Sequence, residues 1–93
     1  LDEDVMARVV DKFIRQLQTS LQERKVTLSL TDGARRDLAQ RGYDPVFGAR
    51  PLGRLIESEI GNLLADEILF GRLAGGGKVR ISCKAGKLNF SYS

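Results

Sequence analysis

The chain has 93 residues, of which 42% are hydrophobic and 29% are charged, and its formal net charge is +3. This composition predicts one folded domain with a modest core and argues against a disordered segment. Histidine is absent and Cys83 is the single cysteine, which excludes an intrachain disulfide and leaves too few ligands for a zinc site. No apolar run approaches the roughly 20 residues that span a bilayer. We therefore expect a cytoplasmic domain without a membrane partner.

The first half of the chain predicts a helix, a short strand and a second helix. Residues 1–24 carry one apolar stripe at three- and four-residue steps, which favours an amphipathic helix (Met6, Val10, Phe13, Leu17, Leu21, widened by Val9 and Ile14). The alternation from Val26 to Leu30 predicts a strand. Thr31 is the expected N-cap of the second helix, and Gly42 is its expected left-handed end. The chain opens inside the first stripe and without Met, which suggests a piece of a longer protein.

Residues 42–52 read Gly-Tyr-Asp-Pro-Val-Phe-Gly-Ala-Arg-Pro-Leu and join the second helix to a third. Asp44 before Pro45 predicts a turn. Tyr43 and Phe47 are expected to pack into the core and to fasten this loop. Pro51 fits the first turn of a helix, since its missing N–H costs nothing there.

Arg50 therefore lies at the positive end of the third helix, where the helix dipole favours an acid. A guanidinium beside free helix N–H groups is understandable if a phosphate or carboxylate binds there. A solvated arginine that happens to precede a proline is the alternative. Arg54, one turn further on, is either a second anion contact or an ion-pair partner, and we favour the structural role.

The third helix is expected over residues 49–70, with Gly61 marking a close helix contact or a bend. Its predicted buried stripe comprises seven apolar residues (Leu52, Leu55, Ile56, Ile60, Leu63, Leu64, Ile68). Residues 75–77 are all glycine, but no helix follows them, so they do not form a phosphate loop. Residues 78–83 and 87–92 alternate as two strands joined by a hairpin turn. The prediction is a two-layer α+β domain, with about three helices packed on a three-stranded sheet.

The phrase at residues 42–52, followed by Gly-Arg-Leu-Ile-Glu, resembles the sensor-II signature of the Clp-family AAA+ ATPases, which are unfoldase and disaggregase chaperones. The resemblance implies that residues 1–93 are the small C-terminal domain of a second AAA+ module. It assigns to Arg50 a contact with nucleotide phosphates bound by the neighbouring large domain, with Gly48 and Ala49 shaping the close approach. It also implies that Val9 and Val10, at the edge of the first stripe, approach the adenine ring.

The same resemblance implies ATP or ADP with Mg²⁺ in the full-length protein, and none bound to this chain alone. The chain lacks a Walker A loop and an acidic strand end for magnesium, so we expect it not to hydrolyse ATP by itself. The implied partners are the large domain of the same chain, adjacent subunits of a homohexamer, unfolded protein substrates and the Clp peptidase.

Within the family, the segments at residues 9–14 and 67–71, with the later Gly76 and Gly77, favour the A-type ATPase subunit of Clp protease, with the B-type disaggregase as the alternative. Two other classes remain: a stand-alone protein-interaction module and a small nucleic-acid binder. We expect no nucleic-acid binding, because the cations are dispersed along the chain. The arginines at positions 35, 36 and 41 have no aromatic stacking platform beside them.

Overall fold

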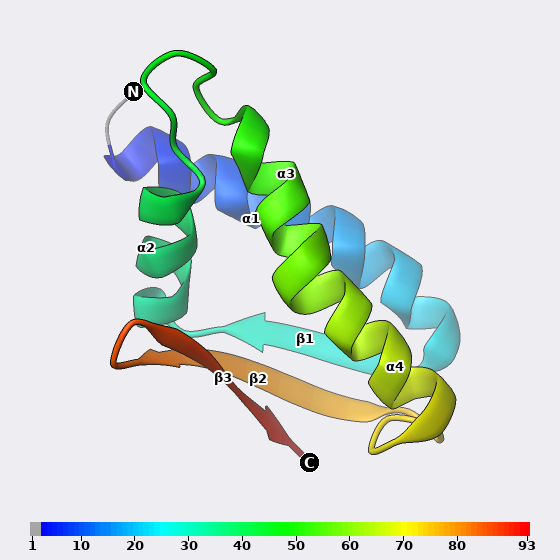
Figure 1. Ribbon diagram of the computed structural model, residues 1–93. Helices are drawn as coiled ribbons and strands as arrows, with labels where there is room; N and C mark the ends of the chain where they lie inside the picture. Colours follow the sequence, from blue (N-terminus) through cyan, green and yellow to red (C-terminus); the bar gives the residue numbers. More distant parts are fainter. Residues whose placement is uncertain (1–2) are drawn as a thin grey trace.

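The computed structural model describes residues 3–93 as a layer of helices above a three-stranded sheet (Figure 1). This confirms the predicted two-layer α+β class. Residues 1 and 2 of the predicted first helix lie outside the described residues. The elements in chain order are α1 (Glu3–Leu21), a 3₁₀ turn (Gln22–Arg24), β1 (Val26–Leu30), α2 (Asp32–Arg41), α3 (Arg50–Ile56), a π-helical segment (Glu57–Gly61), α4 (Asn62–Phe70), β2 (Gly77–Lys84) and β3 (Lys87–Tyr92).

The sheet has the order β1-β2-β3, with β1 parallel to β2 and β2 antiparallel to β3. The predicted alternation is confirmed, since Leu28, Val79 and Ile81 are buried under the helices and the residues between them are exposed. The β2–β3 hairpin turns at Ala85 and Gly86, whose φ angles are +53° and +76°. Two consecutive residues with positive φ match the twist of the flanking strands.

α2 begins at the predicted cap: the Thr31 hydroxyl accepts a hydrogen bond of 3.2 Å from the N–H of Ala34. Its end differs from the prediction, because Gly42 has φ of −87° and is not left-handed. Glycine is needed there for space. A Cβ would lie 2.6 Å from Cδ1 of Leu52 and 2.9 Å from the carbonyl oxygen of Leu38.

The predicted third helix is observed as α3, the π-helical segment and α4 in succession (Figure 1). Gly61 ends the π-helical segment and marks no close helix contact, because a Cβ there would find its nearest neighbour at 3.9 Å. The helices meet closely at Gly53, where a Cβ would lie 3.3 Å from the ring of Phe13 on α1. No sequence pattern had singled out this contact.

Most of the predicted stripe is buried, including Leu52, Ile60 and Leu64, which have no exposed surface. Leu63 is an exception, with 37% of its surface exposed. The π-helical segment ends just before it, at Gly61, and the next residue, Leu64, is buried as predicted. Within residues 3–93, no helix has the combination of length and apolar character needed to cross a membrane.

Candidate functional site

The loop between α2 and α3 is closed by its own backbone. Asp44 and Gly48 exchange two hydrogen bonds, at 2.8 Å and 2.7 Å. One carboxylate oxygen of Asp44 also accepts from the N–H groups of Val46 and Phe47, at 2.7 Å and 2.9 Å. Such a carboxylate turn is typical of aspartate before proline, so the predicted turn is confirmed. The loop is therefore fixed between its two ends, at the end of the molecule away from the sheet (Figure 1).

The predicted packing of Tyr43 and Phe47 is wrong. Tyr43 is 38% exposed and Phe47 is 58% exposed, and Val46 between them reaches 82%. The physical reason is that hydrogen bonds close the loop without help from side-chain burial. Its apolar side chains are left on the outside.

Gly48 has φ of +65°, and a Cβ there would meet no atom within 4 Å among the described residues. The chain itself therefore requires glycine for the left-handed backbone and not for space. Ala49 is half-buried and is the N-terminal flanking residue of α3. Together they turn the chain from the closed loop into the helix that starts at Arg50.

Arg50 is exposed, and its guanidinium forms no hydrogen bond or ion pair with any residue of the described range 3–93. Two other arginines of the fold behave differently. Arg35 pairs with Asp11 and Asp32, each at 2.7 Å, and hydrogen bonding to Asp11 raises the pKa of its guanidinium. Among the same residues, Arg50 instead presents an unpaired cation where the hydrogen-bonded loop meets α3.

Arg41 is bound still more firmly, to Glu59 on the π-helical segment and to Asp37 one turn earlier on α2. Hydrogen bonds to Glu59, which have the larger effect, and to Asp37 raise the pKa of its guanidinium. This bridge ties α2 to the helix that follows Arg50. It therefore helps to fix the direction in which α3 leaves the loop.

The prediction of free helix N–H groups beside Arg50 is wrong in part. The N–H of Arg50 donates to the carbonyl of Phe47 at 3.3 Å, and the N–H of Leu52 donates to that of Ala49 at 3.1 Å. Pro51 between them has no N–H. Any anion contact at this point therefore depends on the guanidinium and not on a cradle of helix amides.

Val9 and Val10, the two residues predicted to approach the adenine ring, differ in their exposure. Val10 has no exposed surface, while Val9 is half-buried at the edge of the stripe. Arg54 is exposed, and it forms no ion pair within residues 3–93. The structural ion pair that we favoured for Arg54 is therefore wrong.

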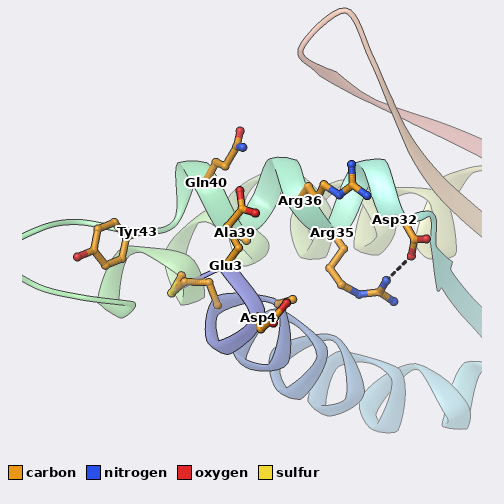
Figure 2. Close-up of a pocket in the computed structure, with 10 residues that line it drawn as sticks. Glu3, Asp4, Asp32, Arg35, Arg36, Ala39, Gln40 and Tyr43 are labelled. Atoms are coloured by element: carbon orange, nitrogen blue, oxygen red, sulfur yellow. Dashed lines mark hydrogen bonds and ion pairs between the residues drawn. The ribbon is translucent and has the colours of Figure 1, made fainter. Parts of the chain in front are cut away.

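A pocket of about 440 Å³ lies between the first turns of α1 and the length of α2, with Tyr43 at its loop end (Figure 2). Its lining contains three carboxylates against two guanidinium groups (Glu3, Asp4, Asp32, Arg35, Arg36). Arg35 is already paired with Asp32, as Figure 2 shows. This balance of charge does not suit a phosphate, and no predicted site residue lines the pocket.

A mixed three-stranded sheet under helices, with an arginine at the junction of a closed loop and a helix, is the arrangement implied by the resemblance to Clp-family small domains. The comparison with protein families supports that class. Residues 1–81 match the family described as the C-terminal, D2-small domain, of ClpB protein. The chain belongs to this family of Clp-type AAA+ chaperones.

Among curated proteins, the chain is 46% identical over 85 residues to "Chaperone protein ClpB" of Brucella suis, covering 91% of this chain and 10% of that protein. It is 44% identical over 84 residues to "ClpA homolog protein" of Fuscovulum blasticum, covering 90% and 11%. It is 43% identical over 86 residues to "Chaperone protein ClpB" of Corynebacterium efficiens, covering 92% and 10%. The chain thus spans about a tenth of the length of these relatives.

These matches correct the preference for the A-type. The family is that of the B-type protein, and most of the relatives described above carry the B-type name. The preference for the A-type depended on short segments, whereas over most of the chain a protein named for each type is similar to it, at 46% and 44% identity.

Proposed function

We propose that this chain is the small domain of a longer B-type disaggregase chaperone, and that it presents Arg50 to the phosphates of a nucleotide bound mainly by a preceding large domain. The observation that carries the proposal is the exposed guanidinium at the start of α3, next to a loop closed at both ends, which has no hydrogen-bond or ion-pair partner among residues 3–93. Such a cation fits a contact with an anion that another domain supplies.

The residues present fit the phosphate end of a nucleotide better than a whole nucleotide. Arg50 supplies a bidentate donor, Gly48 and Ala49 set its approach, and Val9 offers apolar surface for the adenine ring. The sequence carries no Walker A loop and no acidic strand end, so the proposal assigns the magnesium ligands and the phosphate cradle to the large domain. On this proposal the chain alone should not hydrolyse ATP.

When bound, the nucleotide supplies the phosphoryl group whose charge increases during transfer, and an arginine aimed at that charge stabilises it. The chain's contribution is to hold the guanidinium in place. Because the contact is lost with the γ-phosphate, the preferred angle between the small and large domains changes with the nucleotide. This differential contact is the proposed link between hydrolysis and movement.

Assembly of the longer protein into a ring, action on unfolded or aggregated proteins and a cytoplasmic location remain proposals that rest on membership of the family. Delivery to the Clp peptidase was predicted with the A-type assignment. It loses its support with that assignment, and we do not propose it.

The test is the rate of ATP hydrolysis by the longer protein carrying Arg50→Ala, with Arg15→Ala on α1 as the matched control. Both side chains are exposed arginines that form no ion pair among residues 3–93. We expect turnover or nucleotide-dependent assembly to fall in Arg50→Ala, by roughly tenfold or more if a charge-assisted hydrogen bond is lost. Equal turnover and assembly in Arg50→Ala and the parent protein would remove the proposal.

A further inference from the structure

The sheet has an outer face, turned away from the helices, on which the side chains of β1, β2 and β3 include four cations and no carboxylate. Lys78, Arg80 and Lys84 alternate with the buried residues of β2, and Lys87 lies opposite Lys84 on β3. All four are exposed, and none forms an ion pair within residues 3–93. We call these four residues the basic face.

The remaining outer positions of the sheet are neutral and polar (Thr27, Ser29, Ser82, Asn89, Ser91). Every acidic residue of the chain precedes position 68 in the sequence, so the segment that forms β2 and β3 contributes none. Although the cations are dispersed along the sequence, the fold thus brings four of them together without a counter-charge. Such a surface attracts a partner of negative charge.

The two edges of the sheet differ in whether their outward backbone groups are already hydrogen-bonded. The side chain of Gln18 on α1 covers the edge at β1, where it donates to the carbonyl of Val26 at 2.9 Å and accepts from the N–H of Leu28 at 2.5 Å. It occupies backbone groups that a further strand would use. This edge is therefore closed to pairing.

The other edge, at β3, is open. Lys78 and Ser93 exchange two hydrogen bonds at 2.9 Å, so the alternation of an antiparallel ladder turns the N–H and C=O groups of Leu88, Phe90 and Tyr92 outward. Apart from its ladder with β2, β3 has no backbone hydrogen bond to another described element. A row of unpaired backbone groups of this kind can receive a further strand.

We propose that β3 binds an extended acidic segment of a partner protein, which pairs with it as a fourth strand. In such a strand, alternate side chains would lie beside Lys87 on the basic face, where carboxylates are favoured. The others would lie beside the half-buried Leu88, Phe90 and Tyr92, where apolar groups are favoured. Lysine on an edge strand discourages pairing with apolar strands, whereas it attracts an acidic one.

A protein segment fits this surface better than a nucleic acid. Phe90 and Tyr92 pack toward the helices, so the outer face offers no aromatic ring on which bases could stack. The open backbone groups of β3 also match a peptide, which has the same donors and acceptors. The proposal is independent of Arg50, because the loop between α2 and α3 and the start of α3 lie at the end of the fold away from the sheet (Figure 1).

The test uses isotope-labelled full chain and a synthetic peptide of alternating Glu and Val, with alternating Lys and Val as the control peptide. We expect the acidic peptide to shift the amide resonances of Leu88, Phe90 and Tyr92 and to slow their hydrogen exchange. Arg80→Glu with Lys87→Glu should weaken binding by roughly fivefold or more. The matched control, Lys12→Glu with Arg15→Glu on α1, makes the same change in net charge at exposed positions and should bind as the parent does.

Four results would each overturn the proposal: no binding of the acidic peptide, resonance shifts away from β3, equal weakening in both double variants, or equal binding of the Lys-Val peptide. Tighter binding of single-stranded oligonucleotide with a steep salt dependence would assign the basic face to nucleic acid instead. Self-association through β3 without peptide would assign the edge to a second copy of the chain. An unchanged amide spectrum outside the substituted sites confirms that the variants are folded.

Discussion

Gly42→Ala tests the packing that holds the two ends of the Arg50 loop together. The new methyl group would lie 2.6 Å from Cδ1 of Leu52, 2.9 Å from its Cβ and 2.9 Å from the carbonyl oxygen of Leu38. Carbon atoms in contact are normally about 3.5–4.0 Å apart. Leu52 is fully buried, and the carbonyl of Leu38 accepts the N–H of Gly42 at 2.8 Å, so neither can withdraw freely.

We therefore expect Gly42→Ala to lower the free energy of unfolding by about 1–3 kcal/mol, the usual cost of overpacking. In a domain of this size, each kcal/mol of lost unfolding free energy lowers Tm by roughly 4–8 °C. The measurement is thermal and urea unfolding of the chain followed by circular dichroism. The φ of −87° suits alanine, so any loss must come from the contacts and not from backbone strain.

Gly75→Ala is the matched control, because a Cβ there would meet no atom within 4 Å and its φ lies outside the left-handed range. It should leave stability within about 0.5 kcal/mol or raise it slightly. The cost of Gly42→Ala should also be smaller in a Leu52→Ala background, since part of the obstruction is removed. Equal stability of Gly42→Ala and Gly75→Ala would refute this account of the junction.

Three further predictions concern local contacts. Thr31→Ala should cost about 1 kcal/mol of stability in urea unfolding through loss of the N-cap, while Thr31→Ser should be nearly neutral. Asp44→Ala should speed hydrogen exchange at the amides of Val46 and Phe47, which donate to its carboxylate; unchanged exchange would show that the carboxylate does not hold the loop. Burial raises the pKa of the Tyr92 phenol above its ordinary value of 10.0, so the folded state binds more protons there and stability should decline as pH rises above about 10. Tyr92→Phe should reduce that decline in pH-dependent unfolding, and an identical pH profile would contradict it.

The parts of the fold that follow from local rules were predictable from the sequence. The alternation around Leu28 and the cap at Thr31 each depend on residues close in sequence, and both predictions are confirmed. The role of Gly42 depends on Leu52, which comes from another helix, and no local rule could reveal that contact. The π-helical segment at residues 57–61 and the exposure of Leu63 also differ from the prediction, because the sequence pattern predicts one regular helix with Leu63 on its buried side.

The sequence predicted where Arg50 lies in the candidate site, but not which contacts hold the adjoining loop. The position of Arg50 at a helix start follows from Pro51, and the structure agrees. Burial of Tyr43 and Phe47 was expected because aromatic residues close to a core are usually buried. The expectation is wrong, since backbone hydrogen bonds and the Asp44 carboxylate close the loop and both rings stay exposed. Asp44 before Pro45 predicts a turn, but the pattern does not show that its carboxylate accepts from the N–H groups of Val46 and Phe47.

The central claim is that Arg50 contacts nucleotide phosphates in the longer protein, and equilibrium binding of ATP and ADP tests it most directly. Affinities would be measured for the parent, Arg50→Ala and Arg15→Ala proteins under conditions that prevent hydrolysis. The account predicts that Arg50→Ala weakens ATP binding relative to ADP binding by roughly tenfold or more, while Arg15→Ala leaves the ratio unchanged. The same ATP-to-ADP affinity ratio in all three proteins would contradict it.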